Sequence, residues 1–129
     1  MRKPIEKILR VLVILPAILF VVMGLRWITD PAGAASSLGM PLLDGLGRSS
    51  QIGDVGTLFL TMGLMILIGL VTRARPWFYA PALMLAAVAS FRVLAWLIHD
   101  AAPAIDMIVV ELIIATLLVL AAPKLSEKV

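Results

Sequence analysis

Residues 76–122 read PWFYAPALML AAVASFRVLA WLIHDAAPAI DMIVVELIIA TLLVLAA, two long apolar stretches around a short polar turn. A helix needs roughly 20 residues to cross a bilayer, and each stretch is long enough to do so. Arg92 lies inside the first stretch and Glu111 inside the second. Because short connections join antiparallel neighbours, this segment predicts a transmembrane hairpin that carries one base and one acid below the membrane surface.

Two more apolar stretches precede this hairpin, at residues 8–28 and 55–72. Apolar residues make up 62% of the 129 residues and charged residues 15%. Soluble domains have roughly 45–50% and about 25%. The composition excludes an ordinary soluble globule and predicts a single all-α domain, residues 1–129, built as a polytopic bundle of four transmembrane helices. We expect the spans at residues 8–28, 50–72, 76–99 and 101–122, with a long outer loop at 29–49.

The positive charges are unevenly distributed along the chain. With an even number of spans both termini lie on one side of the membrane. That side carries Arg2, Lys3, Lys7, Arg10, Arg73, Arg75, Lys124 and Lys128, and the other carries Arg26, Arg48 and Arg92. Cytoplasmic segments are enriched in Lys and Arg, so we expect cytoplasmic N and C termini in a multi-pass protein of a bacterial-type inner membrane. The net charge of +3 then reflects topology, and we expect no nucleic-acid partner.

The first apolar stretch has an alternative interpretation as a signal peptide. It has a basic start, and the small residues Ala32, Gly33 and Ala34 match a cleavage site. The run is long for a signal peptide, however, and Arg26 and Trp27 come between it and that site. We therefore favour a spanning helix, with Trp27 as an interfacial anchor.

The long loop contains signals for a short helix. Asp30 and Pro31 match an N-cap and a first helical position, and Gly39 matches a helix stop, which predicts a helix at residues 31–38. The loop is also rich in leucine and methionine, so it could dip into the membrane interface as a lid or serve as a plain connection. The residues concerned are Leu38, Met40, Leu42, Leu43 and Leu46.

Small residues recur at helical spacing in two spans. Gly56 and Gly63 share one face of the second span, and Gly69 lies somewhat off that face. In the third span Ala82, Ala86 and Ser90 recur every four residues. Such residues let helix backbones approach closely, either within the bundle, which we favour, or at a homodimer seam.

Residue counts exclude several kinds of chemistry. The chain has no Cys, which rules out disulfides, thiolate catalysis and iron–sulfur clusters, and its one His is His99. Three-His zinc sites and paired haem ligands are therefore impossible within one chain, and we expect no metal site. No cofactor is identifiable beyond a bound lipid or quinone, and enzymatic activity stays an open question.

Arg92 and Glu111 are the residues on which a functional prediction rests. Arg92 lies about 9 Å inside the outer end of its helix, and Glu111 about 7.5 Å inside its own. A charge at mid-bilayer costs ~2.5–3.5 kcal/mol, and the cost is smaller nearer the surface. Pairing is favoured at both depths, so we predict an Arg92–Glu111 ion pair that faces the bundle interior.

Other polar groups could join this pair. We expect Asp54 in the first turns of the second helix, where the helix dipole favours a carboxylate. Arg26 lies near the outer end of the first helix, four residues from Asp30, and His99 shares the helix face of Arg92, nearer water. The sequence thus predicts one outward-facing pocket with an apolar floor. Its rim would consist of Arg26, Asp54, Arg92, His99 and Glu111.

Three interpretations of this constellation stay open. The pair could be structural and fix the register of the helices. It could be the polar head of a pocket for a lipid, quinone or other amphiphile. It could also belong to a proton relay.

The order of the motifs resembles the small four-helix DoxX-like membrane proteins, in particular a subgroup without an assigned function. The motifs are Gly24-Leu25-Arg26-Trp27, Asp30-Pro31, Gly53-Asp54-Val55-Gly56, Met62-Gly63, Arg92, His99-Asp100 and Glu111. The resemblance implies a four-helix bundle. It also implies a quinone-linked or accessory role with Arg92 and Glu111 in the pocket, for which a partner would have to supply the redox groups.

From these observations we expect an accessory or amphiphile-binding membrane protein. A purely structural subunit, an enzyme acting on a lipid-soluble substrate and a proton-coupled carrier are the alternatives. The expected partners are membrane lipid and either a second copy of the chain or a larger membrane complex.

Overall fold

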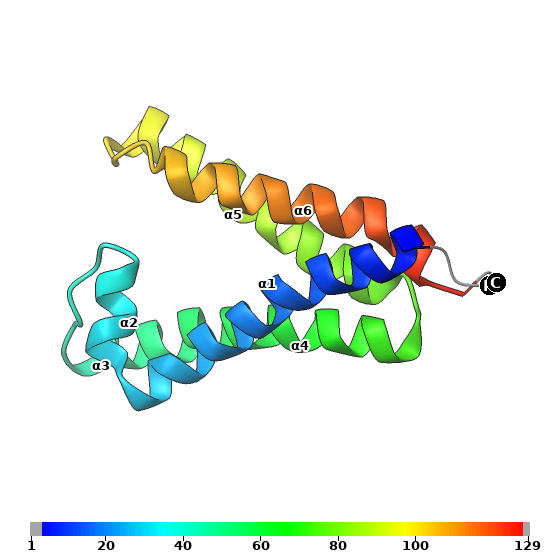
Figure 1. Cartoon of the computed structure of the whole chain (residues 1–129). Coiled ribbons are helices and arrows are strands. Elements are labelled where there is room, and N and C mark those ends of the chain that lie inside the picture. The colour runs from blue at the N-terminus through cyan, green and yellow to red at the C-terminus, as the bar shows by residue number, and fades with distance from the viewer. Residues whose placement is uncertain (1–3, 128–129) are drawn as a thin grey trace.

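A computed structural model describes residues 4–127 of the chain (Figure 1). Within these residues every regular element is a helix, which confirms the all-α fold. The elements are α1 (Pro4–Thr29), α2 (Pro31–Ser37), α3 (Gly45–Ser50), the π-helix η1 (Gln51–Gly56), α4 (Thr57–Thr72), α5 (Pro76–His99) and α6 (Ile105–Leu125).

Four helical segments are long and apolar enough to cross a membrane, so the chain is a multi-pass membrane protein. The third span agrees with the expected residues 76–99, and the other three differ. The first covers Pro4–Thr29 instead of 8–28, and the fourth ends at Leu125 instead of 122. The second span begins at Gly45, because α3 and η1 continue into α4. The fourth begins at Ile105, because Asp100 adopts a left-handed conformation (φ 57°) that ends α5, and residues 101–104 form the turn.

The four long helices form two antiparallel pairs. Helix α1 packs against α4, and α5 packs against α6 (Figure 1). The pairs meet where α1 begins, α6 ends and the α4–α5 turn lies, which we call the terminal end. They diverge toward the α5–α6 turn and helices α2 and α3, which we call the loop end. The main core joins both pairs and includes Ile66, Phe78 and Leu118, each 0% exposed.

Glycines set the close approach of α1 to α4. A Cβ atom on Gly63 would lie 2.7 Å from the carbonyl oxygen of Ala17, and one on Gly56 would lie 2.8 Å from the Cβ of Trp27. Gly69, off this face, instead faces Trp77 of α5. The predicted use of Gly56 and Gly63 in packing within the bundle is therefore confirmed.

Trp27 is 1% exposed, so the prediction that it is an interfacial anchor is wrong. Its side chain packs over Gly56, whose missing side chain makes room for the indole. Helix α2 then covers it with two buried alanines, Ala34 and Ala35. The N-cap of α2 forms as expected, because Asp30 accepts a hydrogen bond of 3.2 Å from the backbone N–H of Gly33.

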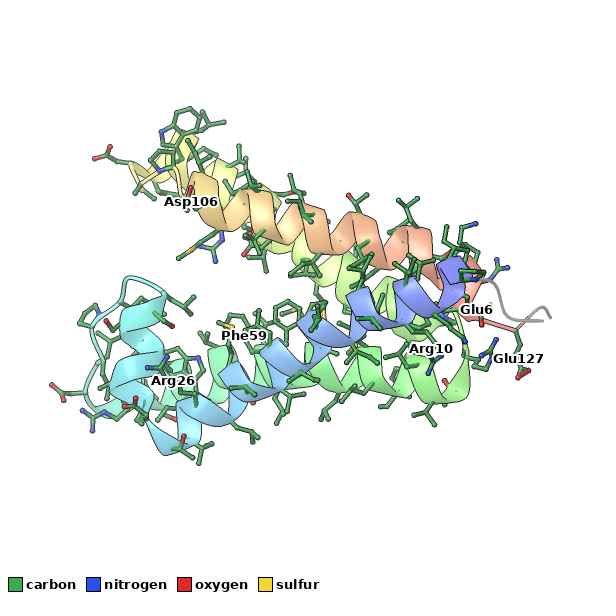
Figure 2. The ribbon with its side chains drawn as sticks, in the orientation of Figure 1. Glu6, Arg10, Arg26, Phe59, Asp106 and Glu127 are labelled. Carbon is green, nitrogen blue, oxygen red and sulfur yellow. The ribbon has the colours of Figure 1, made fainter. Side chains whose placement is uncertain are left out.

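At the terminal end three segments are tied together. The guanidinium of Arg73, in the α4–α5 turn, lies 3.7 Å from the carboxylate of Glu6 on α1. The backbone N–H of Glu127, beyond α6, donates to the carbonyl of Arg73 at 2.9 Å. Figure 2 shows Glu6 and Glu127 together at this end of the molecule.

Candidate binding cleft

Arg92 and Glu111 form the predicted ion pair. The Nε–H of Arg92 donates to both carboxylate oxygens of Glu111, at 3.1 Å to Oε1 and 3.0 Å to Oε2. The side chains are 29% and 13% exposed. The interaction therefore joins α5 to α6 in a partly buried environment.

The α5–α6 turn explains why these residues meet. Arg92 lies about 10 Å before the end of α5, and Glu111 about 9 Å after the start of α6, at 1.5 Å per residue. The left-handed Asp100 reverses the chain, and the backbone N–H of Ala101 donates back to the carbonyl of Ala95 at 3.2 Å. The short turn sets the two helices antiparallel with both side chains at the same depth.

The ion pair lies in the wall of a cleft between the two helix pairs. Two adjoining cavities, of about 670 Å³ and about 270 Å³, share Leu38, Phe59, Arg92 and Glu111 in their linings. We call them together the central cleft. In the larger cavity α4 faces α5, and in the smaller one α1 faces α6. The central cleft therefore passes between the pairs on the side where they diverge.

The lining of the central cleft is mostly apolar. Ligand sites typically have this character, with a few polar groups that fix orientation, and volumes of about 300–1,000 Å³. The polar side chains of the lining are Arg92, Glu111, Asp106 and Ser37. A molecule with one polar end and an apolar body matches this distribution.

Arg92 keeps hydrogen-bonding capacity for a ligand. Its hydrogen bonds to other described residues both come from Nε. A guanidinium has five N–H donors, so those on Nη1 and Nη2 can still bind an acceptor. Glu111 likewise has lone pairs beyond the two that accept from Nε. The pair can therefore hold a headgroup without being broken.

Three of the predicted rim residues do not line the central cleft. Arg26 lies 3.5 Å from Asp30 on the exposed end of α1. Asp54 is exposed within η1, well inside a helix that begins at Gly45, rather than in its first turns. His99 is exposed in the last turn of α5. Depth along a helix could be predicted for these residues, but the direction in which each points depends on helix rotation and packing.

Asp106 was not predicted as a site residue, although it lines the smaller cavity with Arg92 and Glu111. It lies in the first turn of α6, and Figure 2 shows it at the loop end of the molecule. The available signal was a second carboxylate in the same short helical segment as Glu111. Among the described residues no group of three or more His, Cys, Asp or Glu side chains could hold a metal ion.

Gln51 is a second residue that sequence reasoning missed. Its side chain is buried, and its Oε1 accepts from the backbone N–H of Leu43 at 2.8 Å. Its Nε2 donates to the carbonyl of Pro41 at 3.0 Å. Gln51 thus fixes the loop that carries Met40, which lines the larger cavity. The loop is one wall of the central cleft as well as a connection.

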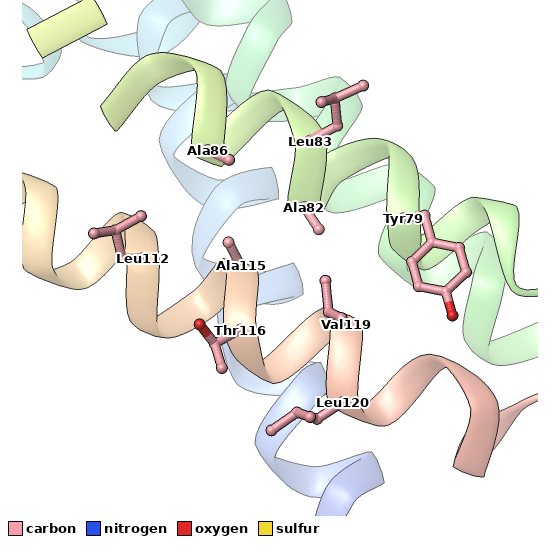
Figure 3. Close-up of a pocket in the computed structure, with 9 residues that line it drawn as sticks. All are labelled: Tyr79, Ala82, Leu83, Ala86, Leu112, Ala115, Thr116, Val119 and Leu120. Atoms are coloured by element: carbon pink, nitrogen blue, oxygen red, sulfur yellow. The ribbon is translucent and has the colours of Figure 1, made fainter. Parts of the chain in front are cut away.

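Another groove, on α5 and α6, differs from the central cleft in its chemistry (Figure 3). Its volume is about 440 Å³, and no charged side chain lines it. Its lining consists of Tyr79, Ala82, Leu83, Ala86, Leu112, Ala115, Thr116, Val119 and Leu120. Such a surface suits contact with lipid chains, and its polar groups are the neutral hydroxyls of Tyr79 and Thr116, so it offers no charged partner for a headgroup.

Comparison of the chain with protein-family models, with curated proteins and with solved structures gives no match in any of the three.

Proposed function

We propose that this protein binds an amphiphile in the central cleft, with the polar end of the ligand at Arg92 and Glu111. The observation that carries the proposal is the position of a charge pair in the wall of an otherwise apolar cavity of about 670 Å³. Charged residues within membrane spans are rare, and they mark ligand or ion sites. An accessory role in presenting or holding a lipid-soluble molecule follows from this binding.

The arrangement of the helices supports access from the membrane. The two helix pairs diverge at the loop end, and the cavity lies between them, where each pair would be surrounded by lipid. We propose that the termini are cytoplasmic and the membrane is a bacterial-type inner membrane, since Lys and Arg gather at the terminal end. The central cleft would then open within the outer leaflet.

The resemblance to DoxX-like proteins fits the same proposal. In that case the ligand would be a lipid or quinone, and any redox chemistry would belong to a partner protein, because the chain has no Cys and one His. The competing function is a structural subunit in which the Arg92–Glu111 pair only fixes helix register. Ligand retention distinguishes the two functions.

Native mass spectrometry of the detergent-purified chain tests the proposal. We expect an adduct of lipid or quinone mass on the unaltered protein and its loss in the Arg92→Gln, Glu111→Gln double variant. The matched control is Arg73→Gln with Glu6→Gln, because that pair has similar side-chain exposure, 22% and 11%, but lies outside the central cleft. Equal adducts in both double variants would contradict a polar-head site, and so would the absence of an adduct from the unaltered protein.

A further inference from the structure

We infer that the ligand of the central cleft is a zwitterionic phospholipid with a primary ammonium, of the phosphatidylethanolamine type. The inference rests on the proposed function and adds the chemical class of the headgroup. It follows from the charges that line the central cleft, from their hydrogen-bonding capacity and from their order along the helices.

The charge of the lining disfavours an anionic headgroup. One guanidinium, Arg92, faces two carboxylates, Glu111 and Asp106, in the smaller cavity. The formal charge of the lining is therefore negative, and a headgroup with net negative charge would add repulsion, most strongly at Glu111, which is less exposed than Asp106. A zwitterion adds no net charge and can place each of its charges next to an opposite one.

Each charge of an ethanolamine headgroup has a partner in the central cleft. The terminal N–H donors of Arg92 suit a phosphate, which guanidinium groups bind well. The carboxylates of Glu111 and Asp106 accept hydrogen bonds only, and an ammonium with N–H groups supplies them. Asp106 precedes Glu111 by five residues, which is about 7.5 Å of backbone rise along α6, so a headgroup with its phosphate at Arg92 has a second acidic residue on the side toward the loop end.

The apolar part of the smaller cavity continues in the opposite direction. Leu85 precedes Arg92 on α5, and Ile114 follows Glu111 on α6, so both lie closer to the terminal end than the ion pair does. Phe20 of α1 completes this apolar section. Polar groups toward the loop end and apolar groups toward the middle of the spans reproduce the polarity of a phospholipid. The groove of Figure 3 has no charged side chain in its lining.

A competition experiment tests the headgroup. The full chain in detergent is mixed with equal amounts of phosphatidylethanolamine, phosphatidylcholine and phosphatidylglycerol of identical acyl chains, and the adducts are counted by native mass spectrometry. We expect phosphatidylethanolamine to exceed each of the others by about tenfold, the factor that one charge-assisted hydrogen bond provides. Phosphatidylcholine tests the N–H donors, because its ammonium has none, and phosphatidylglycerol tests the net charge.

Two single variants locate the effect. Asp106→Asn should reduce the preference over phosphatidylglycerol several-fold, whereas Asp100→Asn, in the exposed α5–α6 turn and outside the central cleft, should leave it unchanged. Asparagine tolerates the left-handed conformation of position 100, so the control should fold. Preference for phosphatidylglycerol, or equal retention of all three lipids, would overturn the inference and leave amphiphile binding standing. Retention of no amphiphile would overturn the proposed function itself.

Discussion

The two ends of the molecule use the same kind of ion pair in different surroundings. At the terminal end Arg73 and Glu6 lie where all four long helices converge, and the backbone of Glu127 is bound to the same turn. At the loop end Arg92 and Glu111 lie where the helix pairs have diverged and a cavity has opened beside them. The side-chain exposures are similar, so burial alone does not separate the two pairs.

The comparison shows that the packing around a charge pair determines what the pair can do. Where helices converge, the pair ties segments of the chain together, and the cavity of about 540 Å³ beside Arg73 is lined only by residues 72–76 and Glu127, not by facing helix pairs. Where helices diverge, donors such as Nη1 and Nη2 of Arg92 border a cavity and can meet a ligand. We therefore expect perturbation of the two ends to have different consequences.

The largest expected effect comes from the interface between α1 and α4, which lies between the two ends of the molecule. Gly63→Leu forces a side chain against the backbone of α1, where even a Cβ would lie 2.7 Å from the carbonyl oxygen of Ala17. Overpacking of this kind costs about 1–3 kcal/mol or more, so the free energy of unfolding in detergent should fall by that amount. Gly53→Ala is the control, because nothing lies within 4 Å of its added Cβ. Equal stability of the two variants would mean that α1 and α4 do not pack as described.

The next effect concerns the ion pair at the loop end. Arg92→Ala or Glu111→Ala alone leaves one charge unpaired, so each should lower the free energy of unfolding by about 1–3 kcal/mol more than the Arg92→Ala, Glu111→Ala double variant does. A double-mutant cycle in detergent measures this coupling. The same cycle on Glu6 and Arg73 should give a coupling of the same sign without any change in retained ligand. If the losses of stability in the two single variants add up to that of the double variant, Arg92 and Glu111 do not stabilise the fold as a pair.

The smallest effect should be confined to one wall of the central cleft. Gln51→Leu removes the side-chain bonds to Leu43 and Pro41. Because both residues are exposed, water can satisfy their backbone groups, and the cost should be about 0.5–1.5 kcal/mol. Amide hydrogen exchange should then increase in residues 40–44 and stay unchanged at Arg73 and Glu127. An equal rise of hydrogen exchange at both ends of the molecule would show that the loop does not open separately from the rest of the fold.

The spans and the ion pair could be predicted because they depend on position along the chain. Apolar length marks a spanning helix regardless of its neighbours, and the third span, predicted at residues 76–99, agrees with α5 at Pro76–His99. The depths of Arg92 and Glu111 follow from the rise of 1.5 Å per residue and a short turn. The same counting placed Asp54 too close to a helix start, because η1 and α3 continue the helix to Gly45.

The rest of the site depends on how each helix is rotated about its axis and on how far the two helix pairs diverge. No sequence pattern indicates either. Trp27 looked like a surface anchor, yet the space over Gly56 and the cover provided by α2 bury it. Arg26 and His99 lie on helices next to the site but outside the central cleft, whereas Asp106 and Gln51 were overlooked and shape it.

By itself the sequence determined a chain with four helices able to cross a membrane and an acid and a base at equal depth on two of them, because hydrophobic length and helical rise are local properties. Only the tertiary structure decided that the two helix pairs diverge at the loop end and leave a cavity beside those charges. That outcome depends on how closely Gly56 and Gly63 bring α1 to α4 and on how the second pair packs against the first, which are contacts between residues far apart in the chain.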